Sequence, residues 1–470
     1  MEIKVEKVLH QHQFEAIQAI LNIKGDKGRI VIPTGGGKTL VEALTLRDRL
    51  NNKRGGKIHL VLAPRIVLLN QLMKNYRNEI GQDYIALAFH SGRYEPDYTK
   101  IVWDEKSTTS INVVGEEFER AKRMKKDLVV FSTYCSAFKL IDYNFHTLIA
   151  DESQYCVAEG FFDTVRDLSS KLKLFFTATE KHTFHDTGRG LNNIDVYGDL
   201  LYQVSPLTLA ERGIIVLPKL HVMTATSKDT VKTVVDEVKN IALAQSKLTN
   251  ETGIPVNKIL FAMEGTADVE TIAKKWATIV TDMPGYRVFT ITSKGGAKIN
   301  GRNYGNNRAE WEKELRESDK ALVFHYDILA EGIDIDGITG VAILRNMKQA
   351  KLLQTIGRAV RIYKANPSLK KNCWVSVTNI NGDEENQRFI MDILMQIRAG
   401  GFDIGREMMT FTGEDGSGIK EDDGIPDAYG NNGASLAQFL LDNIMHQVER
   451  SELAETISLM DINQREEAVF

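Results

Sequence analysis

Three consecutive glycines followed by a lysine and a threonine are the first residues whose types and spacing indicate chemistry. The stretch IVIPTGGGKTLVEAL, residues 30–44, joins a β-branched run to a segment of helical character. A strand, a glycine loop and a helix in this order are typical of a loop that binds nucleotide phosphates. The strict pattern begins with glycine where this chain has Ile32, and the alternative is a glycine-rich turn with a solvated lysine. The residues that we expect at the phosphates are Thr34, Gly35, Gly36, Gly37, Lys38 and Thr39.

Two adjacent carboxylates follow a second apolar run, TLIADESQY, at residues 147–155. In parallel sheets ligands bind at the carboxyl edge, where we expect Asp151 and Glu152. We expect Asp151 to hold Mg²⁺ through water, together with Thr39, and Glu152 to orient and deprotonate an attacking water. The alternative is an ordinary surface Asp-Glu pair. The preceding phosphate loop favours the metal and base roles.

The composition is that of a soluble globular protein of more than one domain. The chain has 470 residues, 43% hydrophobic and 26% charged, and a formal net charge of −4. A chain of this length predicts two or three domains of about 150 residues. The net charge argues against a general polycation, so any nucleic acid would bind in a local basic groove.

The cysteines and the hydropathy pattern indicate a reducing compartment. Cys135, Cys156 and Cys373 are too scattered for a disulfide framework or a zinc site, and we expect them to be small apolar fillers. No signal peptide and no apolar segment of about 18 residues is evident. We therefore expect a cytosolic or nuclear protein without a membrane span.

Short β-branched runs alternate with helical stretches, which predicts an α/β fold with parallel sheets covered by helices. The candidate strands are RIVIPT, KIHLVLAP, LVVFST, TLIADES and LKLFFTAT in a first group, and KILFAM, RVFTITS, ALVFHY and GVAILR in a second. Residues 197–220, with two prolines and a short helix between them, suggest a linker region. We therefore place a first domain at 1–205 and a second at 206–380.

Two segments do not fit this alternation. Residues 91–127 are polar and include the helical stretch EEFERAKRMKK, which we interpret as an insertion in the first domain. Residues 381–470 form a mainly helical C-terminal extension with an acidic, Gly-rich stretch that we expect to be a mobile loop. The later LAQFLLDNIMHQVER has apolar residues at helical spacing and should pack on the core or on a partner.

Five motifs in order resemble those of superfamily 2 DEAD/DEAH-like helicases and translocases. They are PTGGGKT, DESQ, TAT at residues 177–179, EGIDI at 331–335 and QTIGRAVR at 354–361. The resemblance covers about residues 9–365. It implies two tandem RecA-like domains that bind ATP and Mg²⁺ in the cleft between them, with nucleic acid across both, and a nucleic-acid-stimulated ATPase.

The resemblance also assigns roles to single residues outside these motifs. LHQHQFEAI looks like the family's adenine-recognition segment, with Gln13 at the base. The segments LVLAPRIVLLNQ, FSTYCS and TSKGG look like strand-contacting motifs. Contacts of this kind position a strand through its phosphates without reading its sequence. The residues that the resemblance places at nucleic acid are Pro64, Arg65, Thr133, Ser293 and Lys294.

The last motif explains why two domains are needed. In a helix, Gln354, Arg358 and Arg361 share one face at i, i+4 and i+7. The resemblance makes the two arginines fingers supplied in cis to the γ-phosphate, and it places Gly332 and Asp334 in the ribose-contacting motif. The alternative is an amphipathic helix with solvated arginines.

The chain departs from the family at two places. Gln154 stands where Asp or His is usual in the box that couples the ATP site to the TAT motif, although an amide can still donate and accept hydrogen bonds. Tyr326 and Ala330 stand where threonine is common, which affects strand contacts from that loop.

The missing aromatic-glycine segment before Gln13, and Glu331 where DEAD-box proteins carry arginine, favour the DNA-directed branch over the RNA branch. That branch contains restriction-enzyme translocase subunits and phage or bacterial repair helicases. The predicted function is an ATP-dependent DNA helicase or translocase. The alternatives are an RNA helicase, a nucleotide-switched binding protein, and a motor subunit that docks a partner protein through its C-terminal helix.

Overall fold

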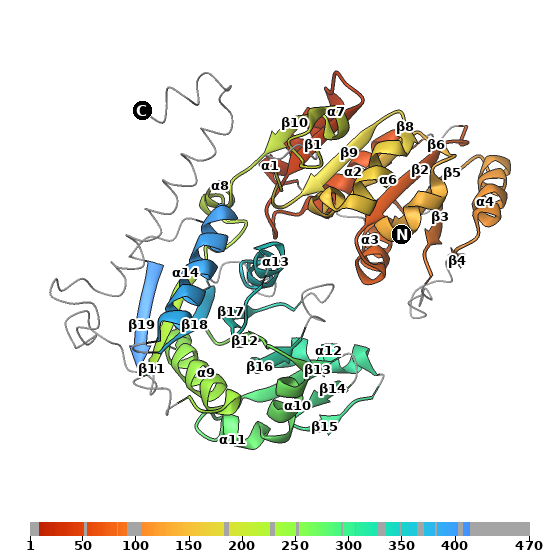
Figure 1. Ribbon diagram of the computed structural model, residues 1–470. Coiled ribbons are helices and arrows are strands. Elements are labelled where there is room, and N and C mark those ends of the chain that lie inside the picture. The colour runs from red at the N-terminus through yellow and green to blue at the C-terminus, as the bar shows by residue number, and fades with distance from the viewer. Residues whose placement is uncertain are drawn as a thin grey trace, which may run out of the picture. The chain divides into compact units, whose positions relative to one another are not determined.

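The chain divides into two compact units, Met1–Ser205 and Pro206–Phe470 (Figure 1). A computed structural model describes residues 9–50, 54–81, 83–91, 106–182, 188–225, 231–250, 253–292, 295–305, 307–326, 335–347, 349–363, 371–380, 383–402 and 408–413. Each unit is an α/β structure built around one large sheet, as the sequence predicts.

The first unit has an eight-stranded sheet in which all neighbouring strands are parallel. The strand order is β10-β1-β9-β7-β2-β5-β3-β4. The strands are β1 (Lys27–Val31), β2 (Ile58–Ala63), β3 (Tyr84–Phe89), β4 (Lys106–Thr108), β5 (Asp127–Thr133), β7 (Thr147–Ala150), β9 (Lys173–Thr177) and β10 (Asp199–Gln203), and β6 (Asn144–Phe145) pairs separately with β8 (Ser169–Ser170).

Helices cover this sheet, whose central strands β2, β5 and β7 are buried along their whole length and are mostly apolar. Leu60, Leu128 and Leu148, from three strands of the sheet, are fully buried in one hydrophobic core. The helices are α1 (Gln11–Leu21), α2 (Lys38–Arg49), α3 (Ile66–Ile80), α4 (Ile111–Arg123), α5 (Tyr134–Ala137), α6 (Glu159–Asp167) and α7 (Ile194–Tyr197), with the 3₁₀ turns η1 (Phe138–Leu140) and η2 (Ser153–Val157).

The second unit has a nine-stranded sheet in the order β15-β14-β13-β16-β12-β17-β18-β11-β19. Seven strands are parallel, and a small antiparallel hairpin is added at the β13 edge. The strands are β11 (Lys219–Ala225), β12 (Asn257–Ala262), β13 (Arg287–Thr292), β14 (Gly296–Ile299), β15 (Arg302–Asn303), β16 (Lys320–His325), β17 (Ile338–Ile343), β18 (Trp374–Ile380) and β19 (Met409–Gly413).

Helices also pack against this second sheet. The core includes Ile259 and Phe261 from β12, and Val238 and Ile241 from the helix that packs on that strand. The helices are α8 (Pro206–Glu211), α9 (Val234–Asn250), α10 (Thr266–Lys274), α11 (Trp276–Val280), α12 (Arg308–Glu317), α13 (Gln349–Ala359) and α14 (Glu384–Ala399). In the part of the chain that the structure describes, none of the helices has the length and apolar character to cross a membrane.

Three segments differ from the expectations drawn from the sequence. The second half of the expected insertion at 91–127 supplies β4 and α4, and α4 packs on β3 and β5 as part of the layered fold. The expected linker at 197–220 contains β10, which pairs in parallel with β1 and so forms the edge of the first sheet. The second sheet continues past residue 380, since β19 pairs with β11. The expected loop and helix beyond residue 413 lie outside the described residues.

Candidate nucleotide-binding site

Three loops of the first unit meet at one edge of the sheet because of the strand order. Strand β9 lies between β1 and β7, and all three strands are parallel. The glycine loop after β1, the Asp151–Glu152 pair after β7 and Thr179 after β9 therefore leave the same carboxyl edge, which is where ligands bind in such sheets. The topology thus brings together two motifs that are more than 100 residues apart in the sequence.

The glycine loop has a backbone that depends on glycine. Gly35 and Gly37 have φ angles of 92° and 80°, in the left-handed region that residues with a side chain rarely adopt. Gly37 directly precedes α2, and a Cβ atom there would lie 2.2 Å from Gln13 Nε2. The conformation and the close approach both require glycine at Gly37. The loop therefore leads directly into the N-terminus of α2, a position suited to anions.

Helix α1 holds this loop from one side. His12 and Gln13 are buried, and their Nε2 atoms lie 2.6 Å and 3.3 Å from the carbonyl oxygen of Gly36. Because a carbonyl can only accept, the His12 tautomer with a proton on Nε2 is required. Gln13 Oε1 accepts from the backbone N–H of His10 at 3.1 Å. The residue predicted at the adenine base thus also fixes the phosphate loop. His12 was not predicted, since nothing in its sequence context distinguishes it from a solvated histidine.

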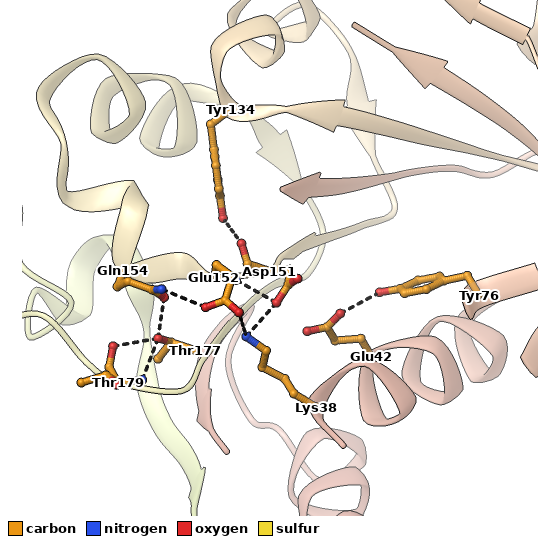
Figure 2. A network of polar contacts seen from close by, with 9 residues as sticks. All are labelled: Lys38, Glu42, Tyr76, Tyr134, Asp151, Glu152, Gln154, Thr177 and Thr179. Atoms are coloured by element: carbon orange, nitrogen blue, oxygen red, sulfur yellow. Dashed lines mark hydrogen bonds and ion pairs between the residues drawn. The ribbon is translucent and has the colours of Figure 1, made fainter. Parts of the chain in front are cut away.

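Lys38 lies between the two carboxylates of the DESQ motif. Its Nζ atom is 2.8 Å from Asp151 Oδ1 and 2.9 Å from Glu152 Oε1 (Figure 2). Burial alone would lower the pKa of Lys38, but the charges of Asp151 and Glu152 outweigh it and raise the pKa above its ordinary value. The amine is therefore a cation at neutral pH. It faces two acids, so the site carries an excess of negative charge.

A chain of polar contacts extends from Glu152 to the TAT motif. Gln154 Nε2 donates to Glu152 Oε2 at 2.8 Å, and the Thr177 hydroxyl lies 2.7 Å from Gln154 Oε1. The Thr177 oxygen in turn accepts from the backbone N–H of Thr179 at 3.1 Å. The glutamine that departs from the family pattern therefore bridges the Asp-Glu pair and the end of β9 (Figure 2).

A third acid, Glu42, was not predicted at this site. It lies one helical turn after Lys38 on α2, it is fully buried, and its Oε2 accepts from the Tyr76 hydroxyl at 3.4 Å. Burial and the neighbouring Asp151 raise the pKa of Glu42 well above its usual range, which favours the protonated carboxyl, and the two acids share a hydrogen bond. The i, i+4 spacing from Lys38 was the available signal.

These residues fit a nucleotide with a divalent cation. A glycine loop at a helix N-terminus suits phosphates, and the negative charge beside it suits a metal ion. Magnesium is usually held by one or two protein ligands together with phosphate oxygens and water, so Asp151 and Thr39 would be enough. Within the described ranges, no group of three or more His, Cys, Asp or Glu side chains could hold a metal ion.

The predicted strand contacts of the first unit lie at the ends of two paired strands. Ala63 of β2 is opposite Thr133 of β5, so Arg65 and Thr133 belong to the same sheet edge. Arg65 is exposed and occupies the N-cap position of α3, while Pro64 is half-buried. Thr133 is buried, and its hydroxyl donates to Ser136 Oγ at 3.1 Å.

In the second unit, Gln354 and Arg358 lie one turn apart on α13, and both are half-buried. The helix ends at Ala359, so the prediction that Arg361 continues the same helical face is wrong. Arg361 instead forms an antiparallel bridge with Ile215, and this pairing takes the chain out of the helix. The predicted residues Ser293, Lys294, Gly332 and Asp334 lie outside the described residues.

The order of these motifs on a parallel sheet defines a helicase-like nucleotide-binding domain. Residues 6–182 match the family described as ResIII, the res subunit of type III restriction enzymes. Residues 6–182, which make up most of the first unit, are therefore identified as a ResIII domain, a helicase-like domain of superfamily 2. This confirms the family that the motifs predict.

Solved structures with a similar fold include two large restriction enzymes. The ATP-dependent Type ISP restriction-modification enzyme LlaBIII bound to DNA matches with 15% identity and a TM-score of 0.66 over 87% of this chain and 31% of that chain. A nuclease-deletion mutant of LlaGI, in complex with a DNA substrate mimic, matches with 18% identity and a TM-score of 0.61 over 83% and 29%. This chain thus spans less than a third of either enzyme.

An RNA-bound protein has the same fold. Mss116p bound to ssRNA and AMP-PNP matches with 14% identity and a TM-score of 0.51 over 82% of this chain and 72% of that chain. A search of curated protein sequences found no significant match. The prediction of two tandem RecA-like domains with parallel sheets is confirmed by the structure and by these similarities of fold.

Proposed function

We propose that this protein is an ATP-dependent DNA helicase or translocase that couples ATP hydrolysis to movement along DNA or to its remodelling. The observation that carries the proposal is the continuous set of contacts from Lys38 through Glu152 and Gln154 to Thr177. It joins the phosphate loop, the expected general base and the TAT motif in one network. A protein that used ATP only as a binding switch would not need a base held in this way.

The positions of the two Glu152 oxygens suggest how the base is prepared. Gln154 holds Oε2, and Lys38 holds Oε1. When Lys38 turns to the β- and γ-phosphates of bound ATP, Oε1 is released and takes a proton from the attacking water. Bound Mg²⁺ would neutralise phosphate charge, with Asp151 and Thr39 as its protein ligands. From the second unit, Arg358 and Arg361 would stabilise the transition state, with Gln354 beside them.

We assign the nucleotide and strand contacts as the resemblance places them. Gln13 and the glycine loop bind the base and phosphates, and Gly332 and Asp334 contact the ribose. The strand contacts come from both units and lie on phosphates rather than bases, which makes binding independent of sequence. The residues assigned to nucleic acid are Pro64, Arg65, Thr133, Ser293 and Lys294.

DNA is the proposed substrate because the ResIII match and the two restriction enzymes, both seen with DNA or a DNA mimic, support it. RNA is the second candidate, favoured by the fold shared with Mss116p bound to ssRNA. A motor subunit that needs a partner protein is the third, because the DNA-bound relatives are about three times longer than this chain.

The steady-state ATPase rate tests this proposal. It would be measured without nucleic acid and with single-stranded DNA, duplex DNA, branched DNA and RNA, with Lys38→Ala as the blank. We expect DNA to raise the rate and Lys38→Ala to abolish it, because the variant lacks the cation at the phosphates. If RNA alone raised the ATPase rate, RNA would replace DNA as the proposed substrate. A rate that no nucleic acid raises above the blank would favour the switch or the partner-dependent motor.

A further inference from the structure

Tyr134 is a buried tyrosine whose hydroxyl contacts the backbone of the Asp-Glu pair. It follows Thr133 at the end of β5, and its side chain is almost completely buried. The hydroxyl donates to the carbonyl oxygen of Asp151 at 2.8 Å (Figure 2).

The peptide group that Tyr134 contacts is held at both of its ends. The carbonyl of Asp151 and the N–H of Glu152 belong to the same peptide plane. Tyr134 donates to that carbonyl, and the N–H donates to Asp151 Oδ1 at 2.8 Å. Glu152 has φ of 51° and ψ of 50°, a left-handed conformation that is rare for a residue with a side chain. The two hydrogen bonds offset the cost of this conformation and fix the direction of the Glu152 side chain.

The segment that carries Tyr134 also has an outward face. Along α5 and η1, Tyr134, Ala137 and Leu140 are buried, whereas Cys135, Phe138 and Lys139 are exposed. More than half of the Phe138 side chain is accessible, and Lys139 Nζ lies 5.9 Å from the centre of its ring. An exposed ring next to a cation suits a nucleic-acid strand, because bases stack on aromatic rings and lysine attracts phosphates.

The outward face lies at the sheet edge where strand contacts are proposed. Thr133, which directly precedes Tyr134, pairs with Ala63 of β2, and the exposed Arg65 follows two residues later. One short segment therefore presents an aromatic ring and a cation to the outside and a hydroxyl to the Asp151 carbonyl inside. Since α5 has only four residues, a displacement of its outer face would move the hydroxyl as well.

We propose that Tyr134 is a positioning residue that links a single-stranded nucleic acid on the Cys135, Phe138 and Lys139 face to the orientation of Glu152. This inference rests on the proposed function. Binding of a strand on the outer face stabilises the α5–η1 segment, and the Tyr134 hydroxyl then holds the Asp151–Glu152 peptide in the orientation that directs Glu152 toward water. The buried Tyr134 hydroxyl acts through the Asp151–Glu152 peptide and not as a catalytic group.

The substitution Tyr134→Phe removes only the hydroxyl. The ring can still stack on Phe161, whose centroid lies 5.6 Å away, so the core contacts are kept. Tyr197→Phe is the matched control, because the buried Tyr197 donates its hydroxyl to the backbone carbonyl of Arg189 at 3.1 Å, in a part of the unit with no assigned role. Both variants lose one hydroxyl-to-carbonyl hydrogen bond.

The measurements are kcat and KM for ATP, with and without single-stranded DNA, and the thermal unfolding midpoint. We expect Tyr134→Phe to lower the DNA-stimulated kcat about tenfold, the rate equivalent of one hydrogen bond, with KM for ATP unchanged within about twofold. Tyr197→Phe should keep the stimulated kcat. The inference is overturned if Tyr134→Phe retains the stimulated kcat, or if both variants lose rate in proportion to a lower unfolding midpoint.

A second variant tests the role of the outer face. It also keeps the proposal testable if Tyr134→Phe does not fold. Phe138→Ala changes an exposed residue, so it should fold normally, and it should raise the DNA concentration for half-maximal stimulation at least about fivefold. An unchanged value would overturn the link to the outer face. If the wild-type protein shows ATPase activity that no nucleic acid stimulates, the proposed function fails, whereas a loss of basal kcat in Tyr134→Phe would still support the positioning of Glu152.

Discussion

At Gly37 the backbone turns with φ of 80° into the first residue of α2, and the amide of Gln13 lies where a Cβ would be. We expect Gly37→Ala to weaken binding of an ATP analogue by about tenfold or more, since the left-handed conformation costs about 1–3 kcal/mol and the Gln13 amide must also move. Equilibrium binding of a fluorescent ATP analogue would measure this.

Gly160→Ala is the matched control for this substitution. Gly160 lies in α6, and a Cβ there would meet no described atom within 4 Å. Alanine is also the better helix former, so this variant should bind the analogue normally and unfold at the same or a slightly higher temperature. Equal binding by the two variants would mean that the loop conformation at Gly37 does not matter for the nucleotide.

At the residue scale, the sequence predicted the charged groups of the site but not the neutral groups that hold them. Lys38, Asp151 and Glu152 were expected together, because a phosphate loop and a strand-end acid pair share the carboxyl edge of a parallel sheet. His12, Tyr134 and the buried Glu42 were not expected. The partners of His12 and Tyr134 are backbone carbonyls on other elements, and such contacts depend on tertiary packing that no spacing in the sequence reveals. Glu42 differs, because its i, i+4 spacing from Lys38 was a signal in the sequence.

At the element scale, the strand β19 is joined to the second sheet by a buried polar cluster. His221 of β11 lies with Nδ1 2.7 Å from Ser376 Oγ of β18 and Nε2 2.8 Å from Thr412 Oγ1 of β19. Gln245 of α9 also donates to Ser376 Oγ, at 2.6 Å. Three strands therefore meet at one fully buried imidazole, and α9 joins the cluster through Ser376.

Burial lowers the pKa of His221 to about 3, so the imidazole stays neutral in the folded protein. In the unfolded chain His221 gains a proton near the ordinary histidine pKa of about 6.5, whereas in the folded chain it does not. The contribution of His221 to the free energy of unfolding is therefore complete above that pH and is lost as the pH falls toward 3. Because of this group, we expect the free energy of unfolding of the second unit to fall by about 1.4 kcal/mol for each pH unit below 6.

Hydrogen exchange of the β11 and β18 amides between pH 7 and pH 5, corrected for intrinsic exchange rates, would measure this loss. His221→Gln is the matched variant, because its amide can still donate and accept but does not titrate. Its amides should show a weaker dependence of stability on pH than those of the wild-type protein. Parallel pH profiles in the two proteins would show that His221 is not the group responsible.

The strands that were missed include edge strands as well as buried strands such as β3, β11 and β18. The nine expected strands lie within the two sheets as β1, β2, β5, β7, β9, β12, β13, β16 and β17. The strands β10 and β19 lie at sheet edges and are short and partly exposed, so they lack the continuous apolar pattern of a buried strand. The run YIALAF of β3 is apolar on both faces and resembles a buried helix as much as a strand.

At the scale of the whole molecule, the proposed mechanism needs residues from both units at one nucleotide. Lys38 and Glu152 belong to the first unit, and Arg358 to the second. If the arginines act in cis, each chain carries a complete set. Arg358→Ala should then keep ATP binding but lower kcat on the order of a thousandfold, as the loss of an arginine finger does. Arg308→Ala, on α12, removes an arginine that pairs with Glu312 and should keep the wild-type rate.

Mixing two inactive variants separates fingers supplied in cis from fingers supplied by a second copy. Lys38→Ala lacks the phosphate cation, and Arg358→Ala lacks the finger. With fingers in cis, no pairing of the two chains assembles an intact site, so an equimolar mixture should show no more ATPase activity than the two separate samples. With fingers in trans, one intact site forms in the mixture. There the Lys38→Ala chain supplies its Arg358 to the nucleotide bound by the Arg358→Ala chain, which keeps Lys38. A rate that rises with total protein concentration in the mixture would therefore assign the catalytic unit to an oligomer rather than to a single chain.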